Sequence, residues 1–103
     1  MRSRVVRRSL RRPGRIVPAA AAHLRGRLVL LRPGDMMDWH STGRREEVVI
    51  MLAGKARLEV RGDSRRVRVS DMRLGQSVFL PQQTVHRLVN RSARSARYLY
   101  LTG

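Results

Sequence analysis

Short runs of alternating apolar and polar residues, divided by turn residues, make up most of the chain. Residues 66–70 are an example, because Val67 and Val69 alternate with arginines as in a strand with one buried face. Turn signals such as Pro33-Gly34 separate the runs, and no stretch has a convincing helical period. The pattern is typical of an all-β sandwich or barrel. It predicts strands at residues 27–31, 36–40, 47–53, 55–60, 66–70, 76–80, 85–90 and 97–101, and an edge strand within 16–22.

The strand predicted at 47–53 is apolar on both faces. Period-2 geometry places Glu47, Val49 and Met51 on one face, and the residues between them on the other face are also apolar. Residues 98–101 repeat this pattern. A small barrel has one interior, so the second apolar face needs cover, either from the chain's own second sheet or N-terminal segment or from a second copy. We favour the second copy, in a sheet-to-sheet homodimer.

The composition excludes several classes of site and location. The 103 residues suffice for one domain, and the absence of cysteine excludes disulfides, zinc ribbons and thiol catalysis. No apolar run approaches the ~20 residues of a membrane span. The basic N-terminus continues into Arg11, Arg12, Pro13 and Gly14 rather than into an apolar stretch. We therefore expect no secretory signal and a cytoplasmic protein without a membrane partner.

Positive charge is concentrated at the N-terminus. The chain has 23 Lys+Arg against 7 Asp+Glu, a formal net charge of +16, and residues 1–15 hold seven arginines and no acid. These features predict a basic, disordered arm over 1–15 and a single domain over 16–103. The arm can bind nucleic acid non-specifically by releasing counterions from phosphates. It has no aromatic interleaving or helical motif that would read a base sequence, and a solvated tail is the alternative.

Three residues are the candidate metal ligands: His40 at the end of a predicted strand, Glu47 at the start of the next, and His86 in a later one. Two imidazoles and one carboxylate form the facial triad that leaves positions on a divalent metal open. Interior-facing residues of neighbouring barrel strands can converge on one point. The alternative is a hydrogen-bonded core histidine and a solvated glutamate. Without a metal, a buried Glu47 would need a neutralising partner such as Arg45 or His86.

Two stretches of the chain carry the spacing of a known family. The first is Gly34, five residues, His40-Ser41-Thr42, four residues, Glu47, six residues, Gly54. The second is Gly75, five residues, Pro81-Gln82-Gln83, two residues, His86, three residues, Asn90. In order and spacing they resemble the two motifs of the cupins. The resemblance covers residues 34–90 and implies a cupin-like double-stranded β-helix, an antiparallel jelly-roll barrel.

Cupins commonly bind a metal through two histidines and a glutamate of the first motif and the histidine of the second. The resemblance thus implies His40, Glu47 and His86 as ligands of a divalent transition metal (Fe, Mn, Ni or Zn). Thr42 stands where the family has its second histidine, and its hydroxyl can at most hold a water there. Gln83 replaces a motif glycine; it either serves the turn or brings its amide oxygen to the metal or a substrate. The residues expected to line the pocket are Thr42, Met36, Met51, Phe79, Gln83, Tyr98 and Tyr100.

The resemblance implies a protein that binds or acts on a small molecule. The family includes dioxygenases, isomerases, epimerases, decarboxylases, sugar-binding modules and seed storage proteins, and fold alone does not choose among them. Our leading hypothesis is a metal-binding cupin, dioxygenase- or isomerase-like if it is an enzyme, whose metal acts as a Lewis acid or activates O₂. The second is a non-catalytic binding or sensor cupin that has lost full metal ligation. The third is a nucleic-acid accessory protein acting through residues 1–15.

Overall fold

The computed structural model describes residues 5–103, which form nine strands and no helix. Residues 1–4, the first part of the predicted arm, lie outside the described residues. The end of that predicted arm takes part in the fold, because Gly14 and Arg15 form the first strand. Residues 5–103 contain no helix that could cross a membrane. The strands are β1 (Gly14–Arg15), β2 (Arg25–Leu31), β3 (Met36–Ser41), β4 (Glu47–Ala53), β5 (Lys55–Arg61), β6 (Val67–Arg73), β7 (Ser77–Leu80), β8 (Val85–Val89) and β9 (Ala96–Thr102).

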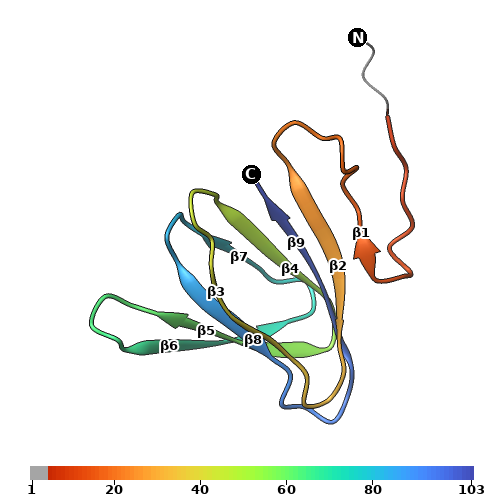
Figure 1. Ribbon diagram of the computed structural model, residues 1–103. Helices are drawn as coiled ribbons and strands as arrows, with labels where there is room; N and C mark the ends of the chain where they lie inside the picture. Colours follow the sequence, from red (N-terminus) through yellow and green to blue (C-terminus); the bar gives the residue numbers. More distant parts are fainter. Residues whose placement is uncertain (1–4) are drawn as a thin grey trace.

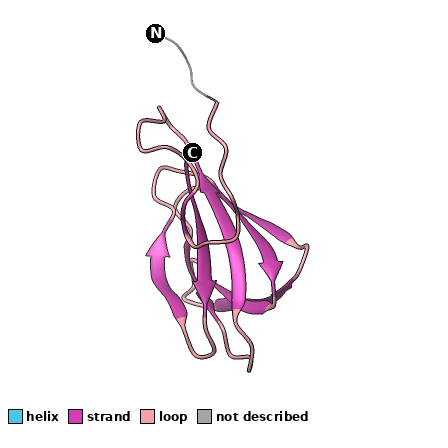
Figure 2. Cartoon of the chain, turned by 90° about the vertical axis from the view of Figure 1, so that its right-hand side faces the viewer, coloured by secondary structure: helices cyan, strands magenta, loops and turns pink. Residues whose placement is uncertain are grey.

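Two sheets face each other, as Figures 1 and 2 show. The first has the strand order β1-β2-β9-β4-β7 and the second β3-β8-β5-β6. Every pairing among the described strands is antiparallel. Strands far apart in sequence lie side by side, because β2 pairs along its whole length with β9 near the other end of the chain. The expected all-β, antiparallel jelly roll is confirmed.

The core fills the space between the sheets with alternate residues of the strands. On β4, Val49 and Met51 are fully buried, whereas Val48, Ile50 and Leu52 are half-buried on the outer face. Tyr98 from β9 and Leu58 and Leu88 from the opposite sheet complete the centre of the core. Part of the outer face of the first sheet is covered by the chain's own N-terminal segment: Val17 of this segment is buried, and so is the outward-facing Leu28 of β2, which pairs with Gly14.

The edge strand predicted within 16–22 is wrong. Pairing beyond β1 is limited to one hydrogen bond from the Ile16 N–H to the Gly26 carbonyl, at 3.1 Å. Pro18 has no N–H to donate to a neighbouring strand, and its carbonyl accepts from the Ala21 N–H at 3.0 Å in a turn. The other predicted strands agree with β2 to β9, with ends that differ by at most three residues.

Gly54 is the one residue between β4 and β5, and this spacing alone predicts a tight hairpin. The prediction is wrong, because β4 lies in the first sheet and β5 in the second. Gly54 has φ +68°, and a Cβ added to it would lie 2.7 Å from the Ser95 carbonyl oxygen. Only glycine fits this left-handed, crowded position, where the chain crosses from one sheet to the other.

Candidate metal centre

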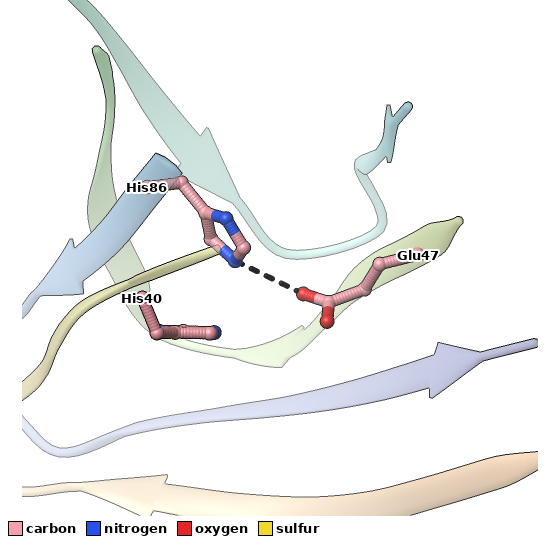
Figure 3. Close-up of side chains that lie close together, drawn as sticks. All are labelled: His40, Glu47 and His86. Carbon is pink, nitrogen blue, oxygen red and sulfur yellow. Dashed lines mark hydrogen bonds and ion pairs between the residues drawn. The ribbon is translucent and has the colours of Figure 1, made fainter. Parts of the chain in front are cut away.

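Three strands bring His40, Glu47 and His86 together between the sheets. His40 on β3 and His86 on β8 are paired across their strands, and their ring centroids lie 4.2 Å apart. Glu47, the first residue of β4, faces them from the other sheet, so that the three side chains point toward one another (Figure 3). One ligand atom from each lies within 4.8 Å of the others. Two ligands that share one ion at ~2.1 Å are roughly 3–4 Å apart, so a small contraction would suffice.

A β-bulge sets the direction of the His40 side chain. Met37 pairs with Leu88 and His40 with His86, so β3 has one more residue than β8 in this interval. Within the bulge, the Trp39 N–H donates to the carboxylate of Asp38 at 2.8 Å. Met37 and His40 consequently both face the interior, although they are three residues apart. The extra residue thus directs an imidazole to the centre.

Trp39, the residue before His40, lies on the outer face of the second sheet. Two guanidinium groups contact its ring, that of Arg61 at 4.5 Å and that of Arg87 at 4.8 Å from the ring centroid. Arg87 also donates to both carboxylate oxygens of the buried Glu59, at 2.7 and 3.3 Å. This outer network of cation–π contacts and a charged hydrogen bond fixes β3, β8 and β5 relative to one another behind the metal centre.

Backbone carbonyls fix which nitrogen of each imidazole faces the interior. Nδ1 of His40 lies 2.8 Å from the Asp38 carbonyl oxygen, and Nδ1 of His86 lies 3.0 Å from that of Thr84. A carbonyl oxygen only accepts, so each Nδ1 carries the hydrogen and each Nε2 is left for the interior. This is the arrangement by which metal-binding histidines are held in place and kept in one tautomer.

The buried pair of His86 and Glu47 needs a cation between its two facing atoms. Nε2 of His86 lies 3.2 Å from a carboxylate oxygen of Glu47, and the side chains are only 1% and 8% exposed. Because Nδ1 already carries a hydrogen, a neutral His86 would direct the Nε2 lone pair at a carboxylate lone pair. Burial acts to lower the pKa of His86, but the hydrogen bonds to Glu47 and Thr84 and the Glu47 charge together raise it. A proton therefore holds the metal-free pair together, and a metal ion can replace it.

A cavity of about 290 Å³ opens beside these three side chains. Burial, with the charges of Glu47 and Tyr100, raises the pKa of Tyr98, which keeps the Tyr98 phenol protonated and disfavours it as a base. A larger hollow of about 750 Å³ lies between the N-terminal segment and β2, but its lining contains neither histidine nor carboxylate. The residues that line the smaller cavity are Met37, His40, Ser41, Thr42, Arg45, Glu47, His86, Leu88, Tyr98, Tyr100 and Thr102.

Thr42 is on the cavity wall, but its hydroxyl is already engaged. The hydroxyl donates to the Pro81 carbonyl at 2.7 Å and accepts from the Thr84 N–H at 3.0 Å. The Thr42 N–H donates in turn to the Thr84 carbonyl at 3.1 Å. In place of a metal-binding imidazole, this position therefore links the loop after β3 to the loop before β8.

Of the residues predicted to line the pocket, Thr42, Tyr98 and Tyr100 border the cavity and four others lie elsewhere. Met36 is 49% exposed, because the bulge in β3 turns its neighbour Met37 inward in its place. Phe79 is 55% exposed on the outer face, where it pairs with Val48. Met51 is wholly buried in the core farther along β4, and Gln83 is an exposed turn residue.

The conformation of Gln83 explains why the motif has glycine at this position. Its φ of +56° lies in the left-handed region, and its N–H donates to the Gly43 carbonyl at 2.8 Å. Of the two roles considered for Gln83, the structure shows the turn.

Sequence reasoning missed Arg45 as a cavity residue and considered it only as a partner of Glu47. Its Nη1 instead donates to the His23 carbonyl and to the Thr102 hydroxyl, both at 3.3 Å. His86 is the partner of Glu47. Alternation could have found Arg45, because it lies two residues before Glu47 and so is expected on the same face.

Comparison with known proteins gives the family. The family model described as cupin domain matches residues 27–102. A cupin 2 conserved barrel domain protein from Salinispora arenicola is similar in structure, with TM-score 0.76 and 20% identity over 98% of this chain and 89% of its own.

Larger proteins contain the same fold. An oxalate oxidase aligns with TM-score 0.71 and 17% identity over 77% of this chain, and an oxalate decarboxylase from B. subtilis with 0.70 and 21% over 78%. This chain spans 41% of the length of the oxalate oxidase and 21% of the length of the oxalate decarboxylase. No curated protein matches the chain. The two sheets, the spacing of the motifs and the family match lead to one conclusion: the chain belongs to the cupin family.

Proposed function

We propose that this protein is a metal-binding cupin that binds or transforms a small molecule at a divalent ion held by His40, Glu47 and His86. The observation that carries the proposal is the orientation of the two imidazoles. Both Nδ1 atoms donate to backbone carbonyls, so both Nε2 atoms are available at a centre that also contains a carboxylate. The donor set of two neutral nitrogens and one anionic oxygen suits Fe, Mn, Ni or Zn.

Three protein ligands leave positions on the ion for water or a substrate. A bound ion would supply Lewis-acid chemistry, or O₂ activation if it is iron. The chain's own part is to orient the ligands from three strands and to shield the centre, since two of the three ligands are buried. The phenol of Tyr98 stays protonated, which disfavours it as a general base. If the protein is an enzyme, we propose dioxygenase- or isomerase-like chemistry that proceeds at the metal.

A non-catalytic binding protein is the second candidate, and Thr42 favours it. The position of the family's second histidine is used for a link between two loops, so the ion would lack one of the usual protein ligands. In that case His86→Ala would retain binding of the small molecule and lose mainly stability. If the protein is an enzyme, His86→Ala would lose metal and turnover together.

Metal content after reconstitution tests the proposal. The purified chain is loaded with each of Fe²⁺, Mn²⁺, Ni²⁺ and Zn²⁺, freed of excess ion, and measured by elemental analysis. We expect close to one equivalent of at least one metal for the wild type, and loss of this metal in His40→Ala. His23→Ala is the matched control, because His23 is exposed and lies outside the centre. Less than about a tenth of an equivalent of every metal would reject the centre.

We also propose that the protein forms a homodimer through the outer face of its first sheet. The outward residues of β9, β4 and β7 form an apolar face whose members are at most half-buried, and Phe79 on it is 55% exposed. The pairing of β4 with β9 and β7 makes these positions contiguous. A second copy of the same face would cover it. The outward residues are Val48, Ile50, Leu52, Phe79, Leu99 and Leu101.

Sedimentation equilibrium tests the dimer. We expect twice the mass of one chain for the wild type and a shift to the single-chain mass for Phe79→Glu. Leu74→Glu is the control, because Leu74 is 67% exposed but lies in the turn between β6 and β7. A wild type with the mass of one chain at all concentrations would exclude the dimer.

A further inference from the structure

We infer that the cavity takes a small carboxylate, held between the metal centre and the guanidinium of Arg45. The inference rests on the metal centre proposed above and names the class of its ligand. It follows from the position of Arg45, from the charges around the cavity, and from the side chains of the wall.

The register of two strands places Arg45 on the wall of the cavity that also contains the metal centre. Glu47 pairs directly with Thr102, and the ladder continues through two hydrogen bonds between Glu46 and Gly103 at 3.0 and 3.1 Å. Arg45 follows at the next position, and its Nη1 donates to the Thr102 hydroxyl at 3.3 Å. The guanidinium therefore lies against the residue that is opposite Glu47, and both Arg45 and Glu47 line the cavity.

Protein groups do not neutralise the charge of Arg45. Its two hydrogen-bond acceptors, the His23 carbonyl and the Thr102 hydroxyl, are uncharged. Among residues 5–103, no carboxylate forms an ion pair with Arg45, and the carboxylate of Glu47 is paired with His86. Both hydrogen bonds are donated by Nη1, and they restrain the guanidinium at the cavity wall, which lowers the entropy cost of binding a ligand there.

The cavity thus has an excess of positive charge once a divalent ion is bound. Glu47 is the only carboxylate among its lining residues, so it offsets one of the two charges of the ion, and Arg45 adds another. An anion would be attracted by both positive groups within a small, partly enclosed space, where such attraction is stronger than in water. A carboxylate suits both positive groups, because its oxygens can bind a metal ion and accept hydrogen bonds from a guanidinium.

The remaining wall favours an organic anion over an inorganic one. Met37, Leu88, Tyr98 and Tyr100 give the cavity an apolar surface for a carbon skeleton. The volume of about 290 Å³ lies just below the ~300–1,000 Å³ that ligand pockets usually have, so the skeleton is short.

Binding of malonate and of its neutral analogue malonamide tests the inference. Zn²⁺-loaded protein, freed of excess ion and with its metal content measured first, is titrated with each compound by calorimetry. We expect malonate to bind the wild type and malonamide to bind at least about tenfold more weakly. Arg45→Gln should weaken malonate about tenfold or more and leave malonamide unchanged, and Arg45→Lys should restore part of the malonate affinity.

Arg44→Gln is the matched control, because it removes the same charge from an exposed neighbour of Arg45 and should bind malonate like the wild type. Equal malonate affinity in Arg45→Gln and wild type would overturn the inference. An equal loss of affinity for malonate and for malonamide in Arg45→Gln would also overturn it, because it would indicate a structural role for Arg45. Arg45-dependent binding of inorganic phosphate without binding of malonate would overturn the assignment to carboxylates. A failure of the metal centre itself is distinguishable, because it appears as absent Zn²⁺ before any ligand is added.

Discussion

Replacing Asn90 by alanine should strongly destabilise the domain, although Asn90 does not line the cavity at the metal centre. The side chain is fully buried and makes four hydrogen bonds. Its Nδ2 donates to the carbonyls of Leu31 at 2.9 Å and Arg94 at 2.8 Å. Its Oδ1 accepts from the Ser92 N–H at 3.0 Å and from the Ser92 hydroxyl at 2.7 Å. Asn90 thereby joins the end of β2 to the loop between β8 and β9.

The cost follows from these bonds. A net contribution of ~0.5–1.5 kcal/mol for each bond, with the buried Leu31 carbonyl left unpaired, gives a loss of about 3–5 kcal/mol for Asn90→Ala. That is a large part of the ~5–15 kcal/mol by which domains are usually stable. The midpoint of thermal unfolding should fall by about 15 °C or more.

Urea unfolding of the metal-free protein in a chelator measures this loss without a contribution from bound metal. Gln82→Ala is the control, because Gln82 is an exposed amide that donates one bond to the Arg44 carbonyl at 2.7 Å. We expect the control to cost less than about 1 kcal/mol. A loss below about 1 kcal/mol for Asn90→Ala, or one equal to that of the control, would refute the reasoning.

Two further predictions concern the turn and the histidine pair. Gln83→Gly should raise the free energy of unfolding by about 0.5–1 kcal/mol, because glycine adopts the left-handed φ of +56° without strain; a decrease in urea unfolding would contradict this. The folded-state pKa of His86 lies above its ordinary 6.5, so the pair with Glu47 stabilises the metal-free protein fully below about pH 6.5 and loses its contribution as the pH rises through the raised pKa. Urea midpoints between about pH 5.5 and 8.5 should therefore fall more steeply for the wild type than for His86→Gln, and parallel curves would show that the pair does not titrate in this way.

The strands could be predicted because alternation is a local pattern, and the meeting of the three candidate ligands could be predicted because their spacing matches a known motif. Alternation defines one buried face, and turn residues mark where strands end. The spacing of His40, Glu47 and His86 then coincides with a known motif, and antiparallel register places the two histidines opposite each other.

The exchange of Met36 for Met37 could not be predicted, because it depends on one extra residue in β3. Strict alternation from His40 places Met36 inside, whereas the bulge at Asp38 and Trp39 reverses the faces before it. The crossing between the sheets at Gly54 could not be predicted either, because a glycine at this position suits both a hairpin and a change of sheet. The Thr42 hydroxyl and the Arg45 guanidinium form hydrogen bonds with residues about 40 to 60 positions away in the sequence. A local pattern therefore could not predict the role of either residue.

The most direct test of the central claim is anomalous diffraction from crystals of the metal-reconstituted protein, collected on both sides of the absorption edge of the loaded metal. We predict one anomalous peak per chain, at ~2.0–2.2 Å from Nε2 of His40, Nε2 of His86 and a carboxylate oxygen of Glu47. A fully loaded crystal with no peak between these three side chains, or with its peak at other residues, would contradict the account.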